Sequence, residues 1–227
     1  MNYSNLLKIA LRAIGANKMR SFLTALGIII GVASVITMLA IGQGSKNSIQ
    51  ANIAEMGSNM IMISPGADMR GGVRQDTSSM ETLKMTDYEA IKDECDYIKG
   101  ISPTVTSSGQ WIYGNNNTPS SIYGVNQDYM DIRQLAIEDG ELFTDADIKA
   151  ASKVCVLGQT VVDNLFGSGT DPIGKVVRFG AIPFRVIGVL KKKGYNSMGM
   201  DQDDLVLVPY TTVMKRILAQ TYLGGIT

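Results

Sequence analysis

The residue types that most often carry enzymatic chemistry are poorly represented in this 227-residue sequence, which contains no histidine. Without histidine the chain can form neither a Ser-His-Asp triad nor a Cys-His pair, and it lacks the usual nitrogen ligand of zinc. Its 21 acidic residues could supply a pair of catalytic carboxylates, but no two stand out by their spacing. We therefore predict no enzymatic activity, no catalytic residue, no cofactor and no metal site.

One segment partly matches the sequence pattern of a nucleotide-binding loop. Residues 169–176 read GTDPIGKV, close to the phosphate-binding pattern G-x-x-x-x-G-K-[ST]. Val176 stands where a hydroxyl group should hold magnesium. We also expect a helix before the segment and a strand after it, which reverses the order that a phosphate-binding loop needs. The segment is therefore predicted to be a turn at the entry of a β-hairpin, and the chain is predicted not to bind ATP.

A second segment partly matches the sequence pattern of a calcium-binding loop. Three acidic residues fall within residues 201–204, but the calcium pattern requires glycine and glutamate where Val206 and Thr212 stand. A solvated acidic loop is the expectation. Met198 and Met200 in the same loop could form an adaptable contact surface, although core positions or chance account for them more simply.

The longest apolar run of the sequence lies near the N-terminus, and it decides where the rest of the chain is placed. Residues 22–41 carry no charge, and twenty helical residues span ~30 Å, the thickness of a bilayer's hydrocarbon core. A cleavable signal sequence would have a shorter basic region and a shorter apolar core. We expect an uncleaved transmembrane helix over residues 21–44. The basic residues that flank it on the N-terminal side are Lys8, Arg12, Lys18 and Arg20.

Charge is distributed unevenly along the chain. Residues 1–54 hold five basic residues and no acidic one, whereas the rest holds 16 basic and 21 acidic residues. By the positive-inside rule the N-terminus faces the cytoplasm, so the main domain is expected in the periplasm or outside the cell, anchored to the inner (cytoplasmic) membrane. Residues 1–20 are expected to form a basic amphipathic helix on membrane lipid. The acidic balance of the main domain argues against nucleic acid as a partner.

Two features, one within the predicted transmembrane helix and one directly after it, suggest mechanical roles. Gly27 and Gly31 form a G-x-x-x-G pattern, which allows close packing on another helix, either of a second copy or of another span. Residues 45–57 lack proline, and Ile49, Ile53 and Met56 recur at helical spacing before Gly57 ends the pattern. A stalk helix is therefore predicted between the membrane and the main domain.

The main domain, residues 58–227, mixes strands and helices without strict alternation, so an α+β fold is predicted. Cys155 lies in the apolar run VCVL and is expected in the core, while a disulfide with Cys95 is left open. Strands are predicted at 59–64, 98–105, 110–113, 120–125, 153–157, 175–179, 183–190 and 205–208, with another beginning near 223. Helices are predicted at 87–95 (with a Thr86–Glu89 capping box), 128–132, 159–166 and 210–219. Residues 65–81, 133–149 and 191–204 are predicted to be irregular.

Several blocks of this sequence, in the right order, resemble the MacB-like permeases, the membrane subunits of ABC transporters of the macrolide and peptide exporter group. The blocks are ALRAIGANKMRSFLTALGIIIGVASVI, the tripeptide Gly57-Ser58-Asn59 leading into a strand, the VLG, LFG and FRVIGVL elements within residues 140–194, and DDLVLVP at residues 203–209. The resemblance covers essentially the whole chain.

The resemblance implies a permease whose first membrane helix extends into a stalk and carries a head with a porter-like part and an inserted lobe. It further implies a homodimer, a separate ATP-binding cassette subunit, and a periplasmic adaptor as a partner. ATP hydrolysis would move the head and expel substrate, a mechanism called mechanotransmission. The family's remaining membrane helices have no counterpart here, so we expect that the chain is a fragment. An alternative is a membrane-anchored regulator whose head activates an external partner such as a cell-wall hydrolase.

Overall fold

The computed structural model describes residues 3–55, 60–66, 82–167, 170–196 and 199–227. The chain divides into two compact units, Met1–Ala51 and Asn52–Thr227. The predicted loop at 65–81 and the glycine at position 57 lie mostly or wholly outside the described residues, so those expectations stay predictions.

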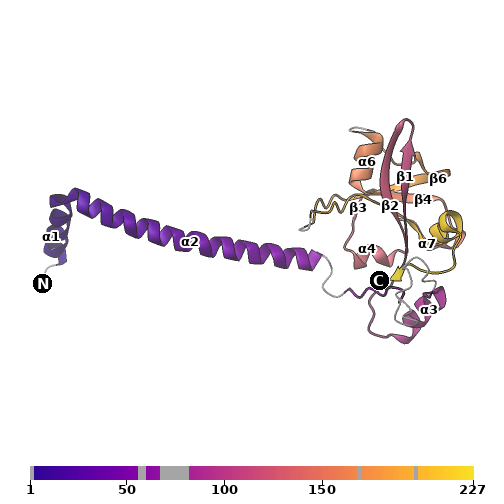
Figure 1. The fold of residues 1–227 in the computed structure, drawn as a ribbon, viewed down its shortest axis with the longest axis horizontal. Coiled ribbons are helices and arrows are strands. Elements are labelled where there is room, and N and C mark those ends of the chain that lie inside the picture. Colours follow the sequence, from indigo (N-terminus) through magenta and orange to yellow (C-terminus); the bar gives the residue numbers. More distant parts are fainter. Residues whose placement is uncertain (1–2, 56–59, 67–81, 168–169, 197–198) are drawn as a thin grey trace, which may run out of the picture. The chain divides into compact units, whose positions relative to one another are not determined.

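The first unit is helical. Helix α1 spans Tyr3–Ala16 and helix α2 spans Lys18–Glu55 (Figure 1). The 38 residues of α2 correspond to a length of ~57 Å at 1.5 Å per residue. Because no proline interrupts it, α2 joins the predicted membrane helix to the predicted stalk without a break. Of the four flanking basic residues, Lys8 and Arg12 lie on α1 while Lys18 and Arg20 lie on the first turn of α2.

The second unit is built on a closed ring of β-strands. Its strands are β1 (Pro103–Tyr113), β2 (Asn116–Val125), β3 (Ile137–Gly140), β4 (Val154–Leu157), β5 (Val176–Phe179), β6 (Ile182–Leu190), β7 (Leu205–Pro209) and β8 (Gly225–Ile226). Pairing runs from β1 to β2, β7, β4, β6, β5 and back to β1, which closes a small barrel of six strands. Strand β3 pairs with β6 outside this ring, and β8 pairs with β1.

Short helices surround the barrel. They are α3 (Met85–Glu94), α4 (Asp128–Ile132), α5 (Asp145–Ala150), α6 (Gln159–Phe166) and α7 (Tyr210–Thr212), which continues as a π-helical turn at Val213–Leu218. Helix α6 contacts β1, β2, β6 and β7, strands from around the ring, and buries its apolar side chains in the core. It therefore helps to hold the ring together rather than covering one sheet face.

The largely aliphatic core of the barrel contains an aromatic cluster. Trp111 on β1 is fully buried, and its ring lies 5.0 Å from that of Phe179 and 5.6 Å from that of Phe184. At Gly109, two residues earlier on the same strand, a Cβ atom would lie 2.6 Å from the ring of Phe179. A side chain at this position would therefore require the buried ring of Phe179 to shift.

The mixed fold and most elements agree with the sequence predictions, including α4 and α6, whose bounds match the prediction, and the hairpin of β5 and β6. Two neighbouring predictions were wrong. The segments expected at 98–105 and 110–113 are one strand, β1, which begins only at Pro103. Residues 133–149 are not irregular, since β3 and α5 lie within them.

Two further predictions need correction. Helix α3 is not capped by Thr86 and Glu89, because Asp87 instead accepts the backbone N–H of Lys84 at 2.7 Å and the helix begins at Met85. In the strand predicted at 59–64, the described residues form only a single bridge, from Ile63 to Ile226. Its two backbone hydrogen bonds, of 2.8 and 2.9 Å, place β8 between Ile63 and β1.

Candidate functional site

The long helix has the properties of a membrane span. Residues Lys18–Gln50 form a helix that is long and apolar enough to cross a bilayer, with none of its most apolar window buried by the protein. Three polar side chains in it donate to carbonyl oxygens of their own helix: Thr24 to Arg20 at 3.0 Å, Ser34 to Ile30 at 2.7 Å and Thr37 to Ala33 at 2.8 Å. Such internal bonds let hydroxyl groups enter lipid without losing their partners.

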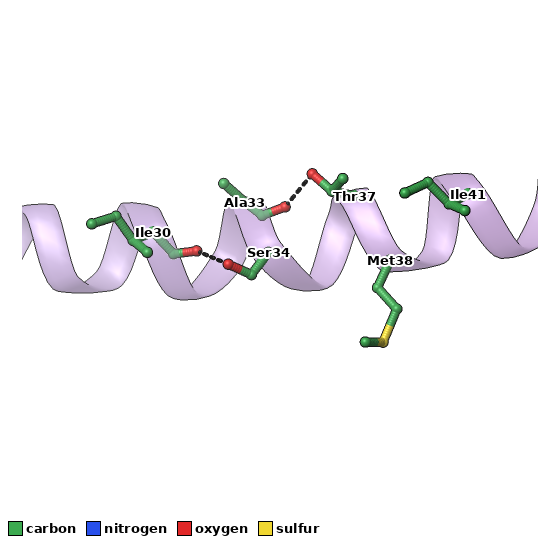
Figure 2. Close-up of a pocket in the computed structure, with 6 residues that line it drawn as sticks. All are labelled: Ile30, Ala33, Ser34, Thr37, Met38 and Ile41. Atoms are coloured by element: carbon green, nitrogen blue, oxygen red, sulfur yellow. Dashed lines mark hydrogen bonds between the residues drawn. The ribbon is translucent and has the colours of Figure 1, made fainter.

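One face of this helix is shallowly grooved. Figure 2 shows the face, where the hydroxyl groups of Ser34 and Thr37 bond back to the helix; it is lined by Ile30, Ala33, Ser34, Thr37, Met38 and Ile41. At Gly27 and Gly31 a Cβ atom would meet no atom within 4 Å. Within the described residues nothing packs against either glycine, so their role in helix packing stays a prediction.

Most of the remaining sequence-predicted residues lie on helices α1 and α2. Lys8, Arg12, Lys18 and Arg20 are all exposed. Of the predicted stalk positions, Ile49 is exposed on α2, Ile53 lies on α2 with its side chain outside the described set, and Met56 lies outside the described residues. The helical state of residues 45–55 agrees with the stalk prediction, and the mechanical role itself is not tested by it.

The nucleotide-like segment has the predicted arrangement. It follows helix α6 and precedes strand β5, and Gly174 adopts a positive φ of 76° in the turn between them. Asp171 accepts the backbone N–H of Ile173 at 2.9 Å, which stabilises that turn. Helix, loop and strand follow in the order opposite to that of a phosphate-binding loop, as the sequence indicated.

The acidic loop is not simply solvated, which corrects the sequence prediction. Asp203 is only 4% exposed, and its carboxylate accepts the backbone N–H groups of Lys193 at 2.8 Å and Gly194 at 2.7 Å. Asp201 accepts the hydroxyl of Thr160 at 2.7 Å and the N–H of Asp203 at 2.9 Å. Only Asp204 is exposed to solvent as expected. These carboxylates act as structural acceptors, and no group of three metal-ligating side chains occurs among the described residues.

The two cysteines have different environments. Cys155 is fully buried in β4, as predicted, and burial raises the pKa of its thiol because the thiolate would be desolvated. Cys95, at the end of α3, is exposed, and both thiols are free. The open question of a disulfide is therefore settled in favour of separate cysteines, and Cys95 is the accessible one.

Sequence reasoning missed an acidic depression beside the barrel. Glu138 and Asp139 on β3, Asp163 on α6 and Asp171 in the following turn line it, together with Lys192. Its apolar lining comes from Val162, Ile173 and Val189. These carboxylates are up to 33 residues apart in sequence, and they come together because both β3 and α6 contact β6. No local sequence signal could have grouped them.

The chain therefore combines a small closed barrel with one N-terminal helix that is long and apolar enough to cross a membrane. The family model for the MacB-like periplasmic core domain matches residues 21–227. The chain belongs to this family.

Named relatives agree with this assignment. The chain is 45% identical over 212 residues to the macrolide export ATP-binding/permease protein MacB of Syntrophobacter fumaroxidans, covering 93% of this chain and 30% of the relative. It is 40% identical over 220 residues to the protein of that name from Pectobacterium atrosepticum, covering 97% of this chain and 33% of the relative. The chain thus spans about a third of the length of these relatives.

Solved structures show the same fold. The periplasmic region of MacB from Actinobacillus actinomycetemcomitans superposes with a TM-score of 0.63 at 30% identity, covering 77% of this chain and 76% of that one. The extracellular domain of the ABC-type transporter YknZ from Gram-positive bacteria gives a TM-score of 0.59 at 23% identity, covering 73% of this chain and 81% of that one. The second likeness concerns the fold alone.

Proposed function

We propose that the chain belongs to the permease of an ABC-type efflux transporter and couples ATP hydrolysis by a separate cytoplasmic ATPase subunit to movement of its extracytoplasmic domain. That movement would expel substrate without a path through the bilayer. Membership in the MacB-like family and the similarity to ATP-binding/permease proteins for macrolide export support the permease role in this proposal. The proposed assembly is a homodimer in the cytoplasmic membrane, with the N-terminus inside, in contact with membrane lipid and with a periplasmic adaptor.

The observation that carries the proposal is the continuity of α2. A bilayer core needs about 20 helical residues, whereas α2 has 38. The remaining residues extend the same hydrogen-bonded rod beyond the membrane. A continuous helix transmits a displacement along its axis, whereas a flexible linker would absorb it. This continuity favours mechanical coupling over simple anchoring.

The test is to interrupt the helix within the predicted stalk while leaving the apolar membrane segment unchanged. We expect Ile49→Pro to reduce export strongly, because proline removes a backbone hydrogen bond and costs a helix interior about 3 kcal/mol. Ile49→Ala is the matched control, since it shortens the same exposed side chain and keeps the helix. Export is measured as macrolide accumulation in cells producing the chain within its transporter. Unchanged export by the proline variant would count against mechanotransmission.

Placement of the domain is tested separately. Cys95 is exposed and Cys155 is buried, so a membrane-impermeant maleimide added to intact spheroplasts reports on Cys95 alone. Labelling without permeabilisation supports an extracytoplasmic domain. The Cys95→Ser variant is the control that should not be labelled. If labelling requires permeabilisation, the proposed topology is wrong. The same assay shows whether the proline variant still inserts.

A further inference from the structure

Residues 222–227, which include β8 and which we name the coupling segment, lie against the start of β1. Ser102 and Thr227 exchange two backbone hydrogen bonds, of 2.8 and 2.9 Å. The N–H of Gly224 donates to the carbonyl of Thr104 at 3.0 Å. Strand β1 continues into the barrel, where it pairs with β2 and β5. The backbone of the coupling segment is therefore joined directly to the barrel.

Side chains of the coupling segment strengthen this attachment. Leu223 is fully buried and Ile226 is only 2% exposed. Both belong to the same apolar cluster as Trp111, so pulling the segment away from β1 would expose aliphatic surface to water. The coupling segment therefore moves with the barrel.

The opposite edge of the coupling segment holds the stretch of chain that follows α2 (Figure 1). Ile63 and Ile226 exchange two backbone hydrogen bonds, of 2.8 and 2.9 Å. Among the described residues, these are the only backbone bonds that residues 60–66 make to another segment. Ile61 and Met62 are 77% and 66% exposed, so side-chain packing adds little on this edge.

A second contact between residues 60–66 and the rest of the unit is weaker. The guanidinium group of Arg133 lies 4.0 Å from the sulfur atom of Met60, in an exposed position. A thioether sulfur is a weak hydrogen-bond acceptor. A displacement of residues 60–66 therefore reaches the barrel mainly through the pair of Ile63 and Ile226.

We propose that the coupling segment carries the displacement of α2 into the barrel, and that the pair of Ile63 and Ile226 is the joint at which it does so. Each residue of this pair both donates and accepts, so a pull on residues 60–66 loads two bonds at once. The attachment to β1 is the stronger one because buried side chains support it, so coupling is lost at the joint first. The inference rests on the proposed function, since it locates the point where the movement enters the barrel.

A glycine in the coupling segment allows the joint to be loosened selectively. At Gly225 a Cβ atom would lie 3.2 Å from the carbonyl oxygen of Ile63, which is the acceptor of the bond from Ile226. Gly225→Val places a branched side chain against that oxygen and should push Ile63 off the coupling segment. Gly66→Val is the matched control, because a Cβ atom there would meet no atom within 4 Å.

The first measurement is amide hydrogen exchange of the intact chain in detergent. We expect Gly225→Val to speed exchange at Ile63 and Ile226 about tenfold or more, and to change exchange in β1 and β2 by less than about twofold. Gly66→Val should change neither. Unchanged exchange at Ile63 in Gly225→Val would overturn the joint. Faster exchange throughout β1 and β2 would also overturn it, because the segment would then stabilise the barrel itself.

The second measurement is export by cells that produce the chain within its transporter. Gly225→Val should lower export to the level of Ile49→Pro, whereas Gly66→Val should export like the wild type. If Ile49→Pro loses export and Gly225→Val keeps it although Ile63 is released, the inference fails and the proposed function stands. Normal export by both Ile49→Pro and Gly225→Val would overturn the two together.

A disulfide across the joint distinguishes transmission from release. Opposed residues that exchange both bonds in an antiparallel pair have Cα atoms about 5.5 Å apart, within the range of disulfides. Ile63→Cys/Ile226→Cys, made together with Cys95→Ser, should therefore form a disulfide when a thiol oxidant is added. We expect equal export with the disulfide formed and reduced, because the joint stays closed while the domain moves. Export only after reduction would mean that the pair must separate in each cycle, and would overturn the proposal.

Discussion

The helical unit and the barrel differ in how directly their sequences determine their structures. In α2, twenty uncharged residues and an uninterrupted helical pattern suffice to define a membrane span, because lipid requires backbone groups to be bonded within the segment. In the barrel, strand β2 pairs in parallel with β7, about 80 residues later, and α6 completes a core formed by strands from around the ring. The solvent determines the first unit, and contacts between distant segments determine the second.

The largest expected change in stability comes from the aromatic cluster of the barrel, and it should affect the barrel without affecting the helical unit. Trp111→Ala should destabilise the barrel by about 3–5 kcal/mol, because it removes a fully buried ring between Phe179 and Phe184. The measurement is urea unfolding of the detergent-solubilised chain followed by circular dichroism. Membrane insertion of the variant should be unchanged, since α2 makes no use of this core.

Trp111→Phe is the matched control for that prediction. The buried indole N–H of Trp111 has no hydrogen-bond partner among the described residues. Phenylalanine keeps an aromatic ring and removes that donor, so the loss should be below about 1.5 kcal/mol. A loss as large as that of the alanine variant would mean that the contacts of the full indole, which a single phenyl ring cannot replace, stabilise the site.

Two valines of equal exposure test whether the solvent determines the first unit. Val32 on α2 is 53% exposed and Val176 on β5 is 54% exposed. Lysine in place of Val32 should cost membrane insertion about 2.5–3.5 kcal/mol, because it places a charge near the middle of the apolar span. Val176→Lys should leave both insertion and barrel stability nearly unchanged, since that side chain faces water. Insertion is measured with a glycosylation reporter, and equal behaviour of the two variants would argue against a membrane span.

The sequence predicted the parts of the fold that depend on local patterns. The apolar run, the spacing within α6 and the strands predicted at 175–179 and 183–190 are complete within short segments, and the structure has a helix or strand at each of them. Strand β3 was missed because Ile137–Gly140 reads as polar, and its strand conformation depends on pairing with β6. Ile63 pairs only through β8, far away in sequence, so the length of its strand could not be read locally.

The candidate sites also divide into those that a local sequence pattern indicates and those that depend on contacts between distant segments. The basic flank, Gly27, Gly31 and the absence of histidine were visible in the sequence, whereas the acidic depression arises only from tertiary pairing. The burial of Asp203 had no local signal at all.

A smaller effect is expected at the cap of α5, which was also missed. Asp147 accepts the N–H of Thr144 at 2.9 Å and its hydroxyl at 2.8 Å. Asp147→Asn should cost about 0.5–2 kcal/mol at pH 7, as for other helix caps. Asp145→Asn in the same turn is the control, because the Asp145 side chain makes no hydrogen bond among the described residues and its loss should cost a few tenths of a kcal/mol.

The pH dependence of that cap has a defined sign. The bonds from Thr144 lower the pKa of Asp147, so the folded state favours the carboxylate. Its contribution is complete above the unfolded pKa of about 3.9 and is lost as the pH falls through the lower folded pKa. Urea unfolding at pH 7 and near pH 3 should therefore show the gap between wild type and Asp147→Asn narrowing at the acidic end. A constant gap would mean that the carboxylate charge is not what caps the helix.

The smallest effect is expected inside the membrane span. Ser34 donates to the carbonyl of Ile30, four residues earlier in its own helix, so Ser34→Ala removes a bond without leaving a donor exposed to lipid. Insertion and self-association of the chain in detergent should both change by less than about 0.5 kcal/mol, because each hydroxyl bond of this kind is local. Gly31→Leu is the contrasting variant, since it would block close packing at the G-x-x-x-G face. If Ser34→Ala weakens self-association as much as Gly31→Leu does, the hydroxyl bonds to a neighbouring helix in the assembly, and the helical unit too depends on long-range contacts.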